Sequence, residues 1–220
     1  MAMTSQFPRT VVFDLDDTLY DECTYVKSGK RAVGKLLEKL YGIDASDILL
    51  DTHQDFIGFA CRKFGLSDAS KDSLLWAYRL HRPSISLRPG VVDLWRTLRQ
   101  AGAAICILTD GREITQRLKV DALGLDPDSL FTSESVGAEK PSPRGYQLIE
   151  ARYPSCDYIY IADNPKKDFV APQRLGWRTF GIRPSLTSIH VGPGTVQLDF
   201  VQPQIWVNDF AELLSHFEAK

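Results

Sequence analysis

Carboxylates gather at the end of the first apolar run in the sequence. The run TVVFDL spans residues 10–15, and Asp14, Asp16 and Asp17 lie at or just beyond its end. Burying a carboxylate costs several kcal/mol unless a cation or a hydrogen-bond donor compensates its charge. The sequence therefore predicts that a cation, from another segment or from a metal ion, lies beside these residues.

Polar groups also follow or adjoin the later apolar runs. Ligands bind at the carboxyl ends of the strands in open α/β sheets, so these groups are expected to meet there. Carboxylate oxygens without a nearby His or Cys favour Mg²⁺ over zinc. One such ion and one lysine would nearly balance about three carboxylates, which leaves the site suited to an anionic phosphate. The groups concerned are Thr109, Asp110, Gly111, Lys140, Asp163 and Asp168.

The spacing of Asp14 and Asp16 suits phosphoryl transfer. On an extended strand, side chains two positions apart leave on the same face. One carboxylate can then attack phosphorus while the other acts first as general acid and then as general base. A hydroxyl such as that of Thr109, with the N–H groups of the following turn, can hold the phosphoryl oxygens.

The elements that must position these groups alternate along the chain. Amphipathic segments at 91–102, 113–124 and 143–153 predict helices, and the first two end at a glycine. Strands that alternate with helices of this length predict a doubly wound, Rossmann-like α/β fold with a mostly parallel sheet. The strands are expected in near-continuous apolar runs, which suit a sheet covered on both faces, at 10–15, 103–109, 129–133, 158–162 and 178–183.

One segment interrupts this alternation. Between about Tyr25 and Arg82 the apolar residues recur at helical spacing, and no strand pattern is present. We therefore expect a helical domain at 23–85, inserted after the first strand, and a core domain formed by 1–22 and 86–220. Within the core, the Pro- and Gly-rich segment 184–204 is expected to be a loop that leads to IWV and to a closing helix capped by Asn208 or Asp209.

Composition narrows the class of protein. The 220 residues are 44% hydrophobic and 25% charged, with a net charge of -2, so neither a disordered chain nor a nucleic-acid or membrane partner is expected. The first ten residues show no secretory signal pattern, and no apolar run approaches the ~20 residues of a membrane span. The four cysteines are widely spaced, which favours reduced thiols and a cytoplasmic protein.

Four motifs together resemble the haloacid dehalogenase (HAD) superfamily. VVFDLDDTL, CILTDG, EKPSP and YIADNPKKD stand in the order in which that family carries them, each at or beside an expected strand end. The helical insert lies where the family has its C1 cap. The resemblance covers roughly residues 8–24 and 88–212.

The resemblance implies a role for each residue of the site. Asp14 would be the nucleophile and Asp16 the general acid and base. Asp17 matches no required role and is expected to be a turn or cap residue. The metal ligands would be Asp14, Asp16 through its backbone carbonyl, Asp163 and Asp168, the last directly or through a water; the phosphoryl group would be bound by Thr109, Asp110, Gly111 and Lys140; and Thr18 would support the site.

The function implied is a Mg²⁺-dependent phosphohydrolase that cleaves a small phosphate monoester, such as a sugar phosphate or a nucleoside monophosphate, through an aspartyl-phosphate. The family's dehalogenases lack an aspartate at the position of Asp16, so its presence favours phosphate esters over halides. A phosphomutase, a non-catalytic binding protein of the same fold and a phospho-acceptor signalling domain are the alternatives. The protein is expected to be a monomer or a homodimer.

Overall fold

The computed structural model describes residues 10–42, 44–47, 55–154, 157–184 and 200–218. Contacts within the chain divide it into two compact units. One unit combines Met1–Glu22 with Ser86–Lys220, and the other is Cys23–Ile85. The larger unit carries the sheet and all of the motifs, so it is described first.

The larger unit contains a six-stranded sheet in which every pair of neighbours is parallel. The strand order is β3-β2-β1-β4-β5-β6. The predicted doubly wound α/β fold is thus confirmed, and the IWV segment supplies the last strand. The strands are β1 (Thr10–Phe13), β2 (Ala104–Thr109), β3 (Ser129–Thr132), β4 (Tyr158–Ala162), β5 (Arg178–Ile182) and β6 (Ile205–Val207).

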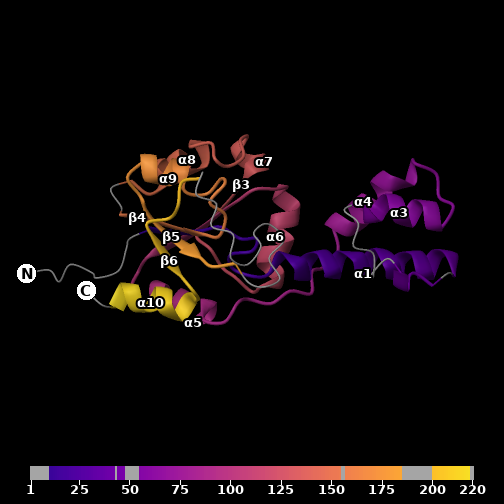
Figure 1. Ribbon diagram of the computed structural model, residues 1–220, viewed down its shortest axis with the longest axis horizontal. Helices are drawn as coiled ribbons and strands as arrows, with labels where there is room; N and C mark the ends of the chain where they lie inside the picture. Colours follow the sequence, from indigo (N-terminus) through magenta and orange to yellow (C-terminus); the bar gives the residue numbers. More distant parts are fainter. Residues whose placement is uncertain (1–9, 43, 48–54, 155–156, 185–199, 219–220) are drawn as a thin grey trace, which may run out of the picture. The chain divides into compact units, whose positions relative to one another are not determined.

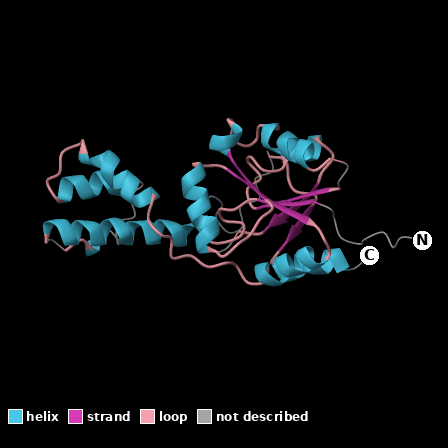
Figure 2. Cartoon of the chain, turned by 180° about the vertical axis from the view of Figure 1, so that it is seen from behind, coloured by secondary structure: helices cyan, strands magenta, loops and turns pink. Residues whose placement is uncertain are grey.

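Helices cover both faces of this sheet (Figures 1 and 2). In Figure 1, α5 and α10 lie along one side of it and α8 and α9 along the other. The predicted helices form at α5, α6, α8 and α10, whereas the short helices α7 and α9 were not predicted. The helices are α5 (Val91–Gln100), α6 (Glu113–Ala122), α7 (Ser133–Val136), α8 (Arg144–Arg152), α9 (Val170–Arg174) and α10 (Phe210–Glu218).

The glycines that follow α5 and α6 stop these helices as the sequence predicts. Gly102 and Gly124 have φ angles of 73° and 67°, in the left-handed region that favours glycine. At the start of α10, the Asp209 carboxylate accepts the N–H of Glu212 at 2.8 Å, so Asp209 caps that helix.

Cover on both faces explains why the strands are apolar almost throughout. On one face, Tyr146 and Ile149 of α8 pack with Val12, Cys106 and Tyr160 of the sheet. On the other face, the ring of Trp95 in α5 stacks on Phe13, with 5.7 Å between centroids. Val11 and Val12 are fully buried. The sheet is therefore a rigid base for the loops at its carboxyl end.

The strand order reverses between β1 and β4, and this places two motifs side by side. β1 pairs with β2 on one side and with β4 on the other. The backbone N–H of Asp14 donates to the carbonyl of Ile161 at 2.9 Å, so the ladder continues to the point where both motifs begin. Asp14 and Asp163 therefore emerge at the crevice where doubly wound folds bind ligands.

The smaller unit is helical. Its helices are α1 (Glu22–Tyr41), which begins in the larger unit, α3 (Phe56–Lys63) and α4 (Ser70–Arg79). Val33 and Leu37 of α1 pack with Ala60 of α3 and Leu74 of α4 in one cluster. Leu40 and Tyr41 share the helical pattern but lie on the exposed last turn of α1. The assignment of this unit as the family's C1 cap stays a prediction.

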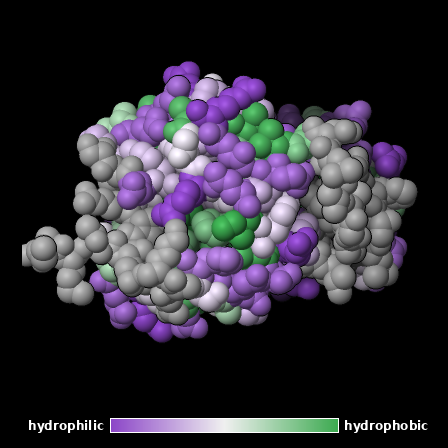
Figure 3. All heavy atoms as spheres, turned by 60° about the vertical axis from the view of Figure 1, so that its left-hand side comes forward, coloured by the Kyte–Doolittle hydropathy of each residue, from purple (hydrophilic) through white to green (hydrophobic). Residues whose placement is uncertain are grey.

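The described residues visible in Figure 3 are mainly hydrophilic, and apolar side chains occupy limited areas between them. No described helix combines the length and the apolarity that a membrane crossing requires. The described cysteines, Cys23, Cys61 and Cys106, are free thiols, while Cys156 and most of the predicted 184–204 loop lie outside the described residues.

Candidate active site

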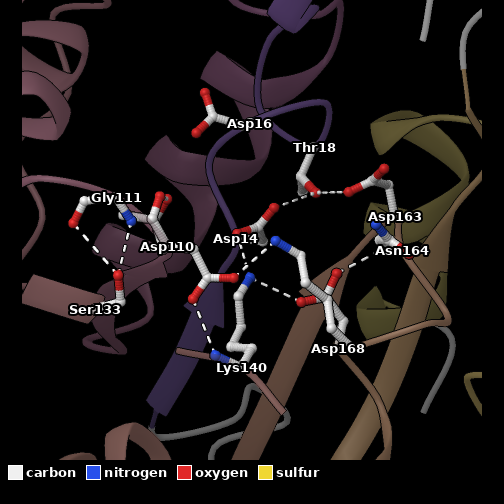
Figure 4. Close-up of polar contacts among 12 residues, drawn as sticks. Asp14, Asp16, Thr18, Asp110, Gly111, Ser133, Lys140, Asp163, Asn164 and Asp168 are labelled. Carbon is white, nitrogen blue, oxygen red and sulfur yellow. Dashed lines mark hydrogen bonds and ion pairs between the residues drawn. The ribbon is translucent and has the colours of Figure 1, made fainter. Parts of the chain in front are cut away.

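A buried lysine lies between two buried carboxylates at the crevice (Figure 4). The Nζ atom of Lys140 is 2.5 Å from Oδ1 of Asp14 and 2.7 Å from Oδ1 of Asp168. The side chains of these residues are 3%, 6% and 0% exposed, respectively, so bulk water barely screens their charges. The predicted meeting of the first, third and fourth motifs thus occurs in the folded chain.

Burial and charge act in opposite directions on the two members of this contact. Burial raises the pKa of Asp14 to about 6, against the opposing effect of the Lys140 ammonium. Burial alone would lower the pKa of Lys140, but Asp14 and Asp168 outweigh it and hold that pKa well above its ordinary value. Lys140 is therefore a permanent cation in the site, whereas Asp14 still needs further positive charge to be fully ionised at mildly acidic pH.

Asp163 completes the acidic group. Its Oδ1 accepts a hydrogen bond from the hydroxyl of Thr18 at 3.1 Å. Its Oδ2 is buried and makes no hydrogen bond to any described residue. Burial, followed by repulsion from Asp14 and Asp168, raises the pKa of Asp163 well above its ordinary range. A buried carboxylate oxygen without a donor is where a metal ion would relieve both effects.

The three carboxylates fit a hard divalent cation. Asp14, Asp163 and Asp168 each offer an oxygen within 4.8 Å of the others. These oxygens are the donor type that Mg²⁺ prefers, and none of the three side chains offers a nitrogen or sulfur ligand. Asp168 differs from the other two because both of its oxygens already accept hydrogen bonds. Oδ1 accepts from the Tyr160 hydroxyl and Oδ2 from the Asn164 N–H, each at 3.1 Å.

The second motif borders this cluster and is tied to it through Asp110. The Asp110 carboxylate accepts a hydrogen bond from the backbone N–H of Lys140 at 3.0 Å and another from the Nζ of Lys167 at 2.7 Å. Burial alone would raise the pKa of Asp110, but Lys140 and Lys167 lower it. The N–H of Gly111 donates to the Ser133 hydroxyl at 2.9 Å. Asp110 and Gly111 thus fix the loop around the site.

Thr109 lies at the end of β2 and is 1% exposed. Its Oγ1 accepts a hydrogen bond of 2.6 Å from the side chain of Gln116. The hydroxyl proton has one weak acceptor in the Asp110 carbonyl, at 3.5 Å. The hydroxyl could therefore turn to donate to a better acceptor.

Asp16 does not share the surroundings of Asp14, and this corrects the expected same-face arrangement. β1 ends at Phe13, so neither carboxylate lies on a regular strand. Figure 4 shows the Asp16 side chain pointing away from the Asp14 carboxylate. Burial alone would raise the pKa of Asp16, but the ammonium of Lys119 and hydrogen bonds from Lys119, Tyr20 and Gln116 lower it.

Asp17 serves the turn between the first motif and α1. Its φ of 56° lies in the left-handed region, where Asp is tolerated better than most residues. Its Oδ1 accepts the N–H of Glu22, the first residue of α1, at 2.9 Å. Asp17 therefore turns the chain through its left-handed backbone, and its carboxylate satisfies an N–H group at the start of α1.

Several residues of the site were not predicted from the sequence. They surround the predicted carboxylates and donate to them. Gln116 and Lys119 share one face of α6, which turns inward in the fold, and the sequence carries no signal of that direction. The set is Tyr20, Gln116, Lys119, Tyr160 and Lys167.

Curated relatives of this chain are archaeal phosphatases. The glyceraldehyde 3-phosphate phosphatase of Methanocaldococcus jannaschii is 28% identical over 78% of this chain and 83% of its own length. The ribulose-1,5-bisphosphate 5-phosphatase of Halopiger xanaduensis is 28% identical over 80% of this chain and 84% of its own length.

Solved structures share the fold. The HAD-hydrolase YfnB of Bacillus subtilis, crystallised with magnesium, has a TM-score of 0.66 at 21% identity and covers 96% of this chain and 98% of its own. CbbY of Rhodobacter sphaeroides, crystallised with phosphate, has a TM-score of 0.61 at 20% identity, over 96% of this chain and 100% of its own.

The family is settled by a match that spans most of the chain. The model of the haloacid dehalogenase-like hydrolases matches residues 8–176, which include all four motifs. The resemblance inferred from the motifs is thereby confirmed, and so is the prediction that the protein is a hydrolase. This chain belongs to the haloacid dehalogenase-like hydrolase family.

Proposed function

We propose that the protein is a magnesium-dependent phosphatase for small phosphorylated sugars. The observation that carries this proposal is the buried contact of Asp14 with Lys140 beside two further carboxylates, at the crevice between β1 and β4. Family membership supports hydrolysis, and the two relatives that are named for phosphorylated sugars support the substrate class. Cytoplasmic location and a monomeric or dimeric state stay predictions.

The reaction proceeds in two displacements on phosphorus. First, an oxygen of Asp14 attacks phosphorus, the bond to the ester oxygen breaks, and the protonated form of Asp16 gives its proton to the departing alcohol. Second, a water attacks the aspartyl-phosphate, Asp16 takes the proton of that water, and the bond between phosphorus and Asp14 breaks to release inorganic phosphate. Lys140 and the hydroxyl of Thr109 bind the phosphoryl oxygens throughout.

Magnesium would be held by the carboxylates of Asp14 and Asp163 and by the backbone carbonyl of Asp16. When bound, it supplies positive charge that offsets the phosphoryl group and orients it. Asp168 would assist through a water, because protein donors already occupy both of its oxygens. The ammonium of Lys140 offsets the repulsion between the carboxylates of Asp14 and Asp168 while the phosphoryl group is bound.

The function is tested by a screen of phosphorylated sugars, nucleoside monophosphates and phospho-acids with Mg²⁺, in which released inorganic phosphate is measured. The Asp14→Asn variant is the blank. Phosphate release from phosphorylated sugars above that blank is expected. Conversion of a sugar phosphate into its isomer without phosphate release would instead indicate a phosphomutase. No turnover of any compound would favour a non-catalytic binding protein.

The affinity for Mg²⁺ is expected to fall as the pH falls below about 6. In the metal-free protein the pKa of Asp14 is about 6 and that of Asp163 is raised, so protons compete with the cation for these carboxylates below that pH. One competing proton weakens the apparent affinity about tenfold per pH unit. Isothermal titration calorimetry at pH 7.5 and pH 5, in buffers of different ionisation enthalpy, measures both the affinity and the released protons. Equal affinity at the two pH values would contradict the assignment of these ligands.

A further inference from the structure

The Asp16 carboxylate is held by three side-chain donors. The Nζ of Lys119 lies 2.7 Å from Oδ1, and the Nε2 of Gln116 lies 2.9 Å from Oδ2. The hydroxyl of Tyr20 donates to Oδ1 as well. Both oxygens are therefore restrained, and the carboxyl group cannot rotate without breaking at least one of these contacts. The family motifs quoted above include none of the three donors.

Two of these donors, Lys119 and Gln116, come from α6, and both side chains are buried. Lys119 and Gln116 are three positions apart, so they lie side by side on one face of the helix. They are 4% and 1% exposed, whereas Ile114 of the same helix is 50% exposed. Burying an ammonium while an isoleucine faces solvent is unfavourable for packing alone. The inward polar face of α6 is thus explained by what it contacts.

Gln116 links Asp16 to the second motif. Its Nε2 also lies 2.6 Å from the hydroxyl oxygen of Thr109 and 3.2 Å from the carbonyl oxygen of Asp110. A carbon added at Gly111 would meet the Gln116 side chain at 3.2 Å, so the loop packs closely on it. The position of Asp16 is therefore tied to the loop that borders the phosphoryl site.

The orientation of Asp16 suits the side of phosphorus where the alcohol leaves. In an in-line displacement the departing oxygen lies opposite the attacking oxygen. A general acid must then lie beyond phosphorus from the nucleophile, not beside it. Asp16 points away from Asp14 in Figure 4, and it pairs with Lys119, whereas Asp14 and Asp168 pair with Lys140.

We propose that Lys119, assisted by Gln116, is a positioning residue that holds the Asp16 carboxyl group on the leaving-group side of the phosphoryl site. This inference rests on the proposed phosphatase function. Lys119 does not touch the reacting atoms in this scheme; it acts through Asp16. Loss of Lys119 therefore frees the Asp16 carboxyl group to turn away from the departing oxygen and leaves the attack by Asp14 intact.

The test is a series of aryl phosphates whose phenols differ in acidity, from 4-nitrophenyl through phenyl to 4-methoxyphenyl phosphate. Nitrophenolate departs without protonation, whereas the other two phenols benefit from a general acid. In Lys119→Met, kcat/KM for phenyl phosphate is expected to fall about tenfold or more beyond any fall for 4-nitrophenyl phosphate. Asp16→Asn, which removes the acid itself, should show the same selective loss to a greater degree.

Matched variants separate positioning from general damage. Arg117→Met removes an exposed cation from the same helix and should leave the whole series unchanged, because Arg117 pairs with Glu113 at the surface. Lys119→Arg keeps a cationic donor and should recover part of the lost kcat/KM for phenyl phosphate. Gln116→Met provides a second variant, with a smaller selective loss, should Lys119→Met not fold.

The outcomes are distinguishable. An equal fall for all three esters in Lys119→Met and Gln116→Met, or no fall in either, would overturn the positioning role and leave the phosphatase function standing. Wild-type protein that hydrolyses none of the esters faster than Asp14→Asn would overturn the proposed function, and this inference with it. A selective loss that grows with the basicity of the leaving phenol supports both.

Discussion

Asp14→Asn is expected to lower the turnover number by about 10⁴-fold or more, because the amide oxygen of asparagine cannot form the aspartyl-phosphate. The fold should be retained. Asparagine has nearly the volume of aspartate, and its Oδ1 can still accept the hydrogen bond from Lys140. The substitution also removes one of the charges that repel Asp163. Steady-state kinetics with 4-nitrophenyl phosphate, alongside thermal unfolding, measures both properties.

Asp17→Asn is the matched control, since it changes a neighbouring carboxylate of the same motif in the same way. Asparagine tolerates the left-handed φ of 56°, and its side-chain oxygen can accept the N–H of Glu22 as Asp17 does. Turnover within about threefold of wild type is expected, since Asp17 has no part in the reaction. Activity in Asp14→Asn above about one per cent of wild type would mean that another group is the nucleophile.

Lys140→Met is expected to destabilise the metal-free protein by about 3–5 kcal/mol at neutral pH, because it leaves two buried carboxylates without their shared cation. Activity should also be lost, since the phosphoryl group loses its lysine. Urea unfolding in EDTA measures the stability. The loss of stability should shrink towards pH 5, because the pKa of Asp14 is raised to about 6 and its protonation removes the repulsion between this carboxyl group and Asp168.

Magnesium provides an internal test of the same variant. It should restore part of the stability of Lys140→Met, since it supplies positive charge beside Asp14, but it should not restore turnover. Lys166→Met is the control, because Lys166 is exposed in the adjacent loop and should change neither property. A Lys140→Met protein as stable as wild type in EDTA would show that the buried cation is not needed to balance these carboxylates.

The strand ends of this protein were predictable because two strong local signals coincide there. Buried parallel strands require long apolar runs, and a charged residue that interrupts such a run must be compensated by a cation or a hydrogen-bond donor. Asp14 and Asp163 stand at such interruptions, and Lys140 lies in the turn between α7 and α8; all three meet at one crevice in the fold. The topology follows from the alternation of strands and helices, so the meeting of these residues could be foreseen.

The donors around the acid group could not be foreseen in the same way. Gln116 and Lys119 lie on an ordinary helix, where a polar side chain is most often exposed. The inward direction of that face depends on how α6 packs beside β3, which no local pattern encodes. The different surroundings of Asp14 and Asp16 depend likewise on where β1 ends and how Asp17 turns the chain.

The apolar runs predicted the class of fold, the four motifs predicted the family, and both together pointed to the carboxylates and the lysine that meet at the crevice. Only the folded chain shows which donor each carboxylate contacts. Lys140 lies between Asp14 and Asp168, and Lys119 pairs with Asp16. The Lys140–Asp14 and Lys119–Asp16 pairs join residues more than a hundred positions apart, and in a low-dielectric interior the distances between charged groups, not their order in the chain, set the charge of each group.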